Sequence, residues 1–179
     1  HWRSALLHYI KSPRDPALDS GVFWEDSKFV CVYDKFPKAE VHLLLLPKTM
    51  RVKGASALRK EHQRLVKSMH NRARWIARGL DNALDHPVRT GFHAVPSMDP
   101  LHLHIISTDF KSDWLKNKKH WNSFTTAFFL DSKKVAEQLT RNGRLDIDAK
   151  EETARLKGPL QCHRCQAVIR TIPHLKKHI

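Results

Sequence analysis

The stretch Leu101-His102-Leu103-His104-Ile105-Ile106 alternates strictly between two kinds of side chain. In a β-strand, this period of two places His102 and His104 on one face and the apolar residues Leu101, Leu103 and Ile105 on the other. Two imidazoles side by side among apolar residues are costly to bury unless they are used. We therefore expect residues 101–108 to form a strand that carries a functional pair of histidines on one face of a sheet.

Three interpretations of this histidine pair are open. The rings are core histidines with satisfied hydrogen bonds, or ligands of a metal ion that also needs a carboxylate or a third histidine, or a catalytic group that acts on phosphorus. A neutral imidazole is a good nucleophile near pH 7, and it forms a labile phosphoramidate that water hydrolyses. A neighbouring histidine can orient the phosphate or share protons with it.

The surrounding sequence predicts an α+β fold with an antiparallel sheet, because strands are followed by a long helix and then by more strands. Apolar residues recur at intervals of three and four over residues 58–80, which predicts an amphipathic helix with a basic opposite face. Shorter helices are expected at residues 3–11 and 132–139. The expected strands are residues 22–24, 29–33, 41–46, 91–95 and 101–108.

The C-terminal segment has the spacing of a zinc finger. Cys162 and Cys165 form a CxxC knuckle, and His178 follows about a dozen residues later. Tetrahedral Zn²⁺ needs a fourth ligand, which is either a group beyond His178 or His174, one helical turn earlier. His163 sits inside the knuckle and is poorly directed for chelation.

A unit this small does not fold alone without metal, so the sequence predicts a structural Zn²⁺. The highly charged residues 146–157 are expected to form a linker. We therefore predict two domains, a larger one at residues 1–155 and the finger at residues 156–179. On the helix of the finger, Lys176 and Lys177 are candidates for contacts with DNA phosphates.

The charge of the chain indicates an anionic partner. The 179 residues carry a formal net charge of +14, whereas 41% hydrophobic residues are enough to build a core. No apolar run approaches the length of a membrane span, which excludes an integral membrane protein. Residues 111–120 combine four lysines with nearby tryptophans, a pattern that suits the edge of a nucleic-acid site. Lys118, His120 and Trp121 are the candidate DNA contacts there; the alternative is a solvated basic loop.

Several segments together resemble the histidine-triad nucleotide hydrolases, and more closely their aprataxin branch. Asp34-Lys35-Phe36-Pro37-Lys38-Ala39-Glu40-Val41-His42 resembles the nucleotide-binding turn and strand of the family. Gly91-Phe92-His93-Ala94-Val95-Pro96-Ser97-Met98, followed by the alternating stretch, resembles the catalytic segment. Leu115-Lys116-Asn117-Lys118-Lys119-His120-Trp121-Asn122-Ser123-Phe124 resembles the segment that separates aprataxins from other triad proteins, and a CxxC finger follows it.

The resemblance implies a histidine-triad fold and a nuclear enzyme of single-strand break repair. Such an enzyme removes AMP from the adenylated 5′ ends of nicked or broken double-stranded DNA. His102 matches the middle histidine, the nucleophile that becomes AMP-histidine. His104 matches the third histidine of the triad, and His42 matches the supporting histidine behind the site. The resemblance also implies that Asp34 accepts hydrogen bonds from the ribose hydroxyls and that Trp2 stacks on the terminal base pair. The groups that it implies hold the phosphates are Lys38, His93, Ser97 and Lys119.

One position departs from the family pattern. The first histidine of the triad is replaced by Pro100, which removes a group that could protonate the leaving group. The leaving group on adenylated DNA is a 5′-phosphate, whose second pKa of about 6 makes protonation dispensable. We therefore expect activity on a diphosphate linkage, without a catalytic metal, because no cluster of carboxylates for magnesium is evident. The alternatives are a hydrolase of small nucleotides and a non-catalytic zinc-finger module that binds nucleic acid.

Overall fold

A computed structural model describes residues 6–11, 21–49 and 52–179 of the chain. Its centre is a six-stranded antiparallel sheet with the order β1-β2-β3-β5-β4-β6. The strands are β1 (Val22–Glu25), β2 (Phe29–Tyr33), β3 (His42–Pro47), β4 (Val88–His93), β5 (Leu103–Ser107) and β6 (Phe129–Asp131). The predicted α+β class and antiparallel sheet are therefore confirmed.

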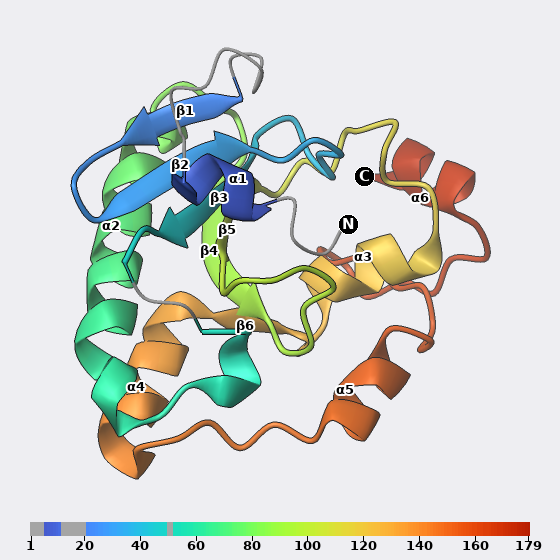
Figure 1. Cartoon of the computed structure of the whole chain (residues 1–179). Coiled ribbons are helices and arrows are strands. Elements are labelled where there is room, and N and C mark those ends of the chain that lie inside the picture. The colour runs from blue at the N-terminus through green and yellow to red at the C-terminus, as the bar shows by residue number, and fades with distance from the viewer. Residues whose placement is uncertain (1–5, 12–20, 50–51) are drawn as a thin grey trace.

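The helices lie on both sides of the sheet, with α2 and α4 together on one side and α3 and α6 toward the other (Figure 1). The α-helices are α1 (Leu6–Lys11), α2 (Gln63–Asp81), α3 (Lys118–Thr125), α4 (Ser132–Asn142), α5 (Ala149–Arg155) and α6 (Ile172–His178). Two 3₁₀ turns, η3 (Ala55–Ala57) and η4 (Lys60–His62), precede α2. Within the described residues, no helix is long and apolar enough to cross a membrane.

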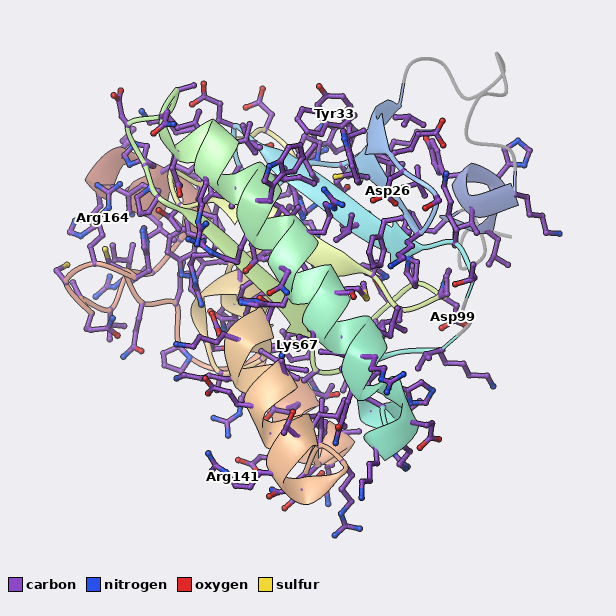
Figure 2. All side chains as sticks on the ribbon, turned by 90° about the vertical axis from the view of Figure 1, so that its left-hand side faces the viewer. Asp26, Tyr33, Lys67, Asp99, Arg141 and Arg164 are labelled. Atoms are coloured by element: carbon purple, nitrogen blue, oxygen red, sulfur yellow. The ribbon has the colours of Figure 1, made fainter. Side chains whose placement is uncertain are left out.

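The main core lies between the sheet and α2. Strand β3 is buried at every position, so its leucines serve both faces of the sheet. On one face, Leu43 and Leu45 of β3 join Leu103 and Ile105 of β5 in the apolar cluster that packs under α2. Helix α2 contributes Val66, Met69, Ala73, Ile76 and Ala77, which recur at helical spacing. Figure 2 views this side and shows Lys67 on the outer surface of α2, with α4 lying beside it.

Several elements differ from the sequence-based expectation; among them, β4 is Val88–His93 rather than residues 91–95. The long helix begins at Gln63 rather than near Leu58, because two 3₁₀ turns occupy the preceding residues. Residues 149–155, expected within a linker, form α5, whose N-terminus is capped by the Asp148 carboxylate. The basic segment 111–120 runs into α3, which was not expected, and short strand β6 was also missed.

A second apolar cluster joins the finger to the sheet. It combines Ile106 of β5, Trp121 and Phe124 of α3, Cys162 of the knuckle and Leu175 of α6. The finger is therefore packed against the same side of the sheet that carries the histidines. The domain division at residue 155 stays a prediction.

Candidate active site

Four histidines meet on the face of the sheet opposite α2. His42 lies on β3 and His104 on β5, and these adjacent strands pair in antiparallel register, with Leu44 opposite His104. His93 ends β4, and its ring centroid lies 4.2 Å from that of His104. His102 immediately precedes β5, with its ring centroid 4.9 Å from that of His104. The structure thus brings together the four histidines expected in the active site.

The ring of His102 is held by the residue that replaces a histidine in the family pattern. Its Nδ1 lies 2.8 Å from the carbonyl oxygen of Pro100. A carbonyl only accepts hydrogen bonds, so Nδ1 must carry the proton. In neutral His102 the lone pair is therefore on Nε2, which has no hydrogen-bond partner in the described part of the chain. This is the tautomer that a nucleophilic nitrogen requires.

A second chain of hydrogen bonds fixes the protons of His42 and His104. The backbone N–H of Lys38 donates to Nδ1 of His42 at 3.2 Å, so the proton of neutral His42 is on Nε2. That Nε2 lies 3.0 Å from Nδ1 of His104, which must then accept. His104 consequently carries its own proton on Nε2, a buried atom with no partner in the described residues. This chain leaves one N–H donor, at Nε2 of His104, buried and unpaired within the histidine cluster.

Burial keeps all four rings neutral. Removal from water lowers the pKa of His42 to about 4, although the nearby Asp34 carboxylate opposes that shift. Burial also lowers the pKa values of His93 and His104 well below the ordinary value, with further contributions from neighbouring histidines. Burial lowers the pKa of His102, against the opposing effect of its bond to the carbonyl of Pro100. Neutral rings at pH 7 follow for the whole cluster.

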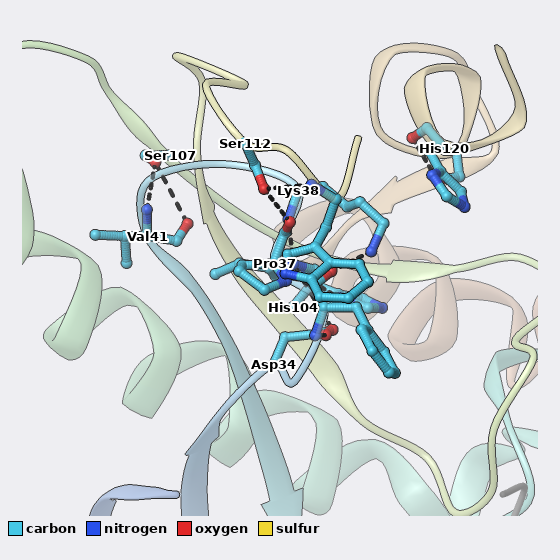
Figure 3. Close-up of polar contacts among 12 residues, drawn as sticks. Asp34, Pro37, Lys38, Val41, His104, Ser107, Ser112 and His120 are labelled. Carbon is cyan, nitrogen blue, oxygen red and sulfur yellow. Dashed lines mark hydrogen bonds and ion pairs between the residues drawn. The ribbon is translucent and has the colours of Figure 1, made fainter. Parts of the chain in front are cut away.

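The turn after β2 supplies a carboxylate and an ammonium beside the cluster (Figure 3). One carboxylate oxygen of Asp34 accepts the backbone N–H of Phe36 at 2.8 Å, and the other lies 3.7 Å from Nδ1 of His42. The ammonium of Lys38 donates to the carbonyl of Phe36. Burial lowers the pKa of Lys38, and the Asp34 carboxylate counters that shift.

Three other residues predicted to contact phosphate or DNA are exposed on the protein surface. Ser97 lies in the loop after β4, and Lys118 and Lys119 begin α3; all three are exposed, and no contact joins them to the histidines among the described residues. The ring of His120 accepts the backbone N–H of Lys116 at 3.2 Å, and Lys38 helps to lower its pKa, although burial is the larger cause.

The two lysines of the finger helix α6 differ in their exposure to solvent. Lys177 is exposed, whereas Lys176 is half-buried, and its ammonium donates to the carbonyl of Ser112 at 2.6 Å. Lys176 therefore also ties α6 to the loop that precedes α3. Trp2 lies outside the described residues.

The prediction that Trp121 contacts DNA is wrong. Its side chain is 1% exposed, and its indole N–H donates to the carbonyl of Gln161 at 2.7 Å. Its ring packs against Phe110 and His163, with centroids 5.0 and 5.3 Å away. Trp121 is a core residue between α3 and the finger, because helix α3 turns its apolar side inward and exposes its lysines.

An aromatic residue that packs against three of the histidines, Phe124, was not predicted from the sequence. Phe124 of α3 lies with its ring centroid 5.2 Å from His42, 4.7 Å from His93 and 5.4 Å from His104. The spacing of Trp121 and Phe124 by three residues is a helical signal that could have indicated this inward face.

The cysteine knuckle and α6 bring three zinc ligands together. The donor atoms of Cys162, Cys165 and His178 all lie within 4.8 Å of one another, with 3.2 Å between Sγ of Cys165 and Nε2 of His178. Two thiolates and an imidazole at such spacing fit tetrahedral Zn²⁺. His174 is exposed and outside this set, and the fourth ligand stays open. His163 packs on Phe110 and Trp121 instead, in agreement with its predicted orientation.

A second group of potential ligands, Asp34, His42 and His104, lies within the histidine cluster. The facing nitrogens of the two histidines share a hydrogen bond, which already occupies one donor atom on each ring. The expectation that catalysis needs no metal stays a prediction.

Comparison with known proteins places this arrangement in a family. Residues 8–120 match the family described as "Scavenger mRNA decapping enzyme C-term binding", and residues 125–179 match the "C2HE / C2H2 / C2HC zinc-binding finger". An aprataxin-like protein of Saccharomyces cerevisiae is 35% identical over 99% of this chain and 94% of its own length. The chain belongs to the aprataxin family.

Solved aprataxin structures share the whole arrangement. The aprataxin ortholog Hnt3 from Schizosaccharomyces pombe is 30% identical, with a TM-score of 0.79 over 99% of this chain and 90% of that chain. Hnt3 in complex with DNA has a TM-score of 0.77 at 29% identity, covering 99% of this chain and 92% of that chain. The histidine-triad fold followed by a zinc finger is thus confirmed.

Longer aprataxins contain additional sequence. The aprataxin of Danio rerio is 41% identical over 100% of this chain but only 53% of its own length. The chain therefore spans about half the length of such relatives.

Proposed function

We propose that this chain is a DNA 5′-adenylate hydrolase that works through a covalent AMP-histidine intermediate. The observation that carries the proposal is the bond from His102 Nδ1 to the Pro100 carbonyl at 2.8 Å, which leaves Nε2 as a free base. Support for the substrate class comes from the aprataxin relatives and from the Hnt3 complex with DNA. Consistent with that substrate, the chain has a net charge of +14.

In the first step, the lone pair of His102 Nε2 attacks the phosphorus of the adenylate. An N–P bond forms as the P–O bond to the DNA 5′-phosphate breaks, and that phosphate departs with the bonding electrons. Its second pKa of about 6 allows it to leave as the dianion without a general acid. This accounts for the tolerance of Pro100 at the first position of the triad.

In the second step, water attacks the same phosphorus. The N–P bond breaks, AMP leaves, and the electrons of that bond return to Nε2 of His102. The proton released by the water goes to the imidazole or to solvent. The enzyme is thereby restored, and the DNA end again carries a plain 5′-phosphate.

The other groups of the cluster stabilise charge on the phosphate. The unpaired Nε2–H of His104 is a donor for a phosphate oxygen, and Lys38 adds a positive charge at the same turn. Ser97, Lys119 and His93 are proposed as further phosphate contacts, and the Asp34 carboxylate as the acceptor of the ribose hydroxyls. Lys118, His120, Lys176, Lys177 and Trp2 are the proposed contacts with the duplex.

The proposed setting is the nucleus, in the repair of strand breaks that carry abortive ligation products. Zn²⁺ bound by Cys162, Cys165 and His178 would serve structure rather than catalysis. Nothing in the proposed reaction requires a second metal.

The test compares AMP release from an adenylated nicked duplex by wild type, His102→Ala and His102→Gln. Loss of the nucleophile should lower the rate by about 10⁴-fold or more, with folding checked by circular dichroism. His86→Ala, outside the cluster, is the matched histidine control and should retain activity. Near-normal release by both His102 variants would contradict the proposal.

Addition of unmodified nicked duplex as a competitor separates the alternative functions. It should inhibit an enzyme of DNA ends, whereas a hydrolase of small nucleotides would be indifferent. Salt-sensitive DNA binding without any AMP release would instead indicate a non-catalytic binding module.

A further inference from the structure

Two partly exposed aromatic side chains, from segments far apart in the sequence, are in contact beside the turn that carries Asp34 and Lys38. Phe36 is 46% exposed and Trp114 is 42% exposed. Their ring centroids are 4.7 Å apart, in an edge-to-face arrangement with an interplanar angle of 66°. Such a pair contributes little to the core, because much of both rings remains in water.

Hydrogen bonds hold the pair to the nucleotide-binding turn. The backbone N–H of Trp114 donates to the hydroxyl oxygen of Ser112 at 3.1 Å. That hydroxyl donates to the carbonyl of Pro37 at 2.5 Å, the contact drawn between Ser112 and Pro37 in Figure 3. Phe36 is itself in the turn, where its N–H bonds Asp34 and its carbonyl accepts from Lys38. The position of the rings is therefore tied to two residues of the proposed active site.

Each ring has a lysine close to it. The ammonium of Lys116 lies 4.5 Å from the ring centroid of Trp114, and that of Lys35 lies 6.0 Å from the centroid of Phe36. Exposed rings interleaved with cations are the features with which proteins bind unpaired nucleotides, since bases stack on the rings and lysines attract the phosphates. Bases within a duplex are already stacked on each other, so only the terminal base pair has a free face, whereas an unpaired base can place its ring directly on the platform.

We propose that Phe36 and Trp114 form a stacking platform for an unpaired nucleobase of the DNA strand that continues past the adenylated end. The inference rests on the proposed function for its choice of DNA as the ligand. Its consequence is a preference for ends with a single-stranded extension over blunt ends.

The test measures the binding of DNA without adenylate, so its outcome does not depend on hydrolysis. Two duplexes are compared, one blunt and one with a recessed 5′ end opposite a 3′ overhang of four thymidines. Trp114→Leu keeps an apolar side chain but removes the aromatic face, whereas Trp114→Phe keeps a smaller one. Trp75→Leu is the matched control, because Trp75 is 56% exposed but lies on α2.

Trp114→Leu should weaken binding of the overhang duplex by about 5- to 100-fold, and its effect on the blunt duplex should be clearly smaller. Trp114→Phe should bind the overhang more tightly than Trp114→Leu does, and Trp75→Leu should match wild type. A 2-aminopurine base in the overhang should be quenched by wild type and not by Trp114→Leu.

Equal losses on the two duplexes, or no loss on the overhang, would overturn the platform. Measurement of AMP release by wild type on adenylated blunt duplex is the separate check on the proposed function. If the chain released no AMP, the proposed hydrolase function would be refuted. The stacking platform would still be accepted or rejected on the binding data for the two duplexes.

Discussion

The backbone amide of Lys38 is the origin of the proton order in the histidine cluster. It donates to His42, His42 donates to His104, and His104 is left with an unpaired, buried N–H at Nε2. His102 is set independently, by the carbonyl of Pro100. His102 thus offers a lone pair and His104 offers an N–H. Phosphoryl transfer to nitrogen needs both, a nucleophile for phosphorus and a donor for the phosphate oxygen.

The neutral buried rings predict a loss of stability in mild acid. A histidine whose pKa is lowered by folding binds fewer protons in the folded state than in the unfolded state at any pH below about 6.5. Its contribution is therefore fully present above that value and is lost as the pH falls toward the lowered pKa, about 4 for His42. For His42 alone the full effect is on the order of 3 kcal/mol.

Urea unfolding between pH 7.5 and 5 measures this dependence. We expect the free energy of unfolding to fall steadily below pH 6.5, and to fall less steeply in His42→Gln. A flat profile between pH 7 and 5 would contradict neutral burial of the cluster.

The positions of His102 and His104 could be predicted from the sequence because alternation and burial agree there. The period of two in residues 101–106 is enough by itself to place His102 and His104 on the same face of a strand. Sequence reasoning failed at Trp121, because an aromatic residue among lysines has the same pattern whether it faces a nucleic acid or a neighbouring module. Only the packing of the finger decides between them.

At the scale of elements, strand β4 depends on the absence of a side chain at Gly91. A Cβ there would lie 2.6 Å from the carbonyl oxygen of Leu130 and 2.6 Å from the ring of Phe129, both on β6. Gly91→Ala should cost roughly 1–3 kcal/mol of stability, because backbone and ring must shift together. It should also lower AMP release, because the shift reaches His93 at the end of the same strand.

Thermal unfolding measures the stability of Gly91→Ala, and Gly79→Ala is the matched control. Gly79 is exposed on α2, and a Cβ added to it would meet nothing within 4 Å, so alanine should stabilise by about 0.5–1 kcal/mol. The same destabilisation in both variants would show that the close approach of β6 does not matter.

Strands with clear alternation or continuous apolar runs were predictable, and β2 was placed at its observed residues 29–33. Short elements that gain their stability from packing were not. Strand β6 has three residues, and α3 and α5 have eight and seven. Isolated helices of that length are marginal in water, so local sequence carries little signal for them.

Across the whole molecule, the finger and the sheet that carries the histidines share one apolar cluster. Cys162 is 1% exposed and lies in the same cluster as Trp121 and Phe124. Because the ring of Phe124 also packs against that of His93, disorder in the finger should propagate toward the histidine cluster.

Removal of the metal tests this connection. The purified chain should contain about one zinc ion, and chelation or Cys162→Ser should lower the Tm by roughly 10 °C. Tryptophan fluorescence should shift to the red as Trp121 becomes exposed. A chain without zinc, or one whose Tm is unchanged by chelation, would contradict a structural metal in the finger.

The charge of +14 is distributed over both sides of the sheet, and only part of it should matter for DNA. Lys177 is exposed on α6, near the proposed site, whereas Lys67 is exposed on α2, on the other side of the sheet (Figure 2). Lys177→Ala should reduce the slope of log K against log salt by about 1. Lys67→Ala removes the same charge and should leave the slope unchanged; equal effects would indicate a response to net charge alone.

The covalent intermediate is the central claim, and trapping it tests that claim most directly. Wild type is mixed with DNA whose 5′-adenylate carries a labelled phosphate in the AMP, quenched within one turnover, and analysed by mass spectrometry under conditions that preserve the N–P bond. The mechanism predicts a mass increase of one AMP on the peptide that contains His102, absent in His102→Ala. Rapid AMP release without any such adduct, or an adduct on another residue, would contradict it.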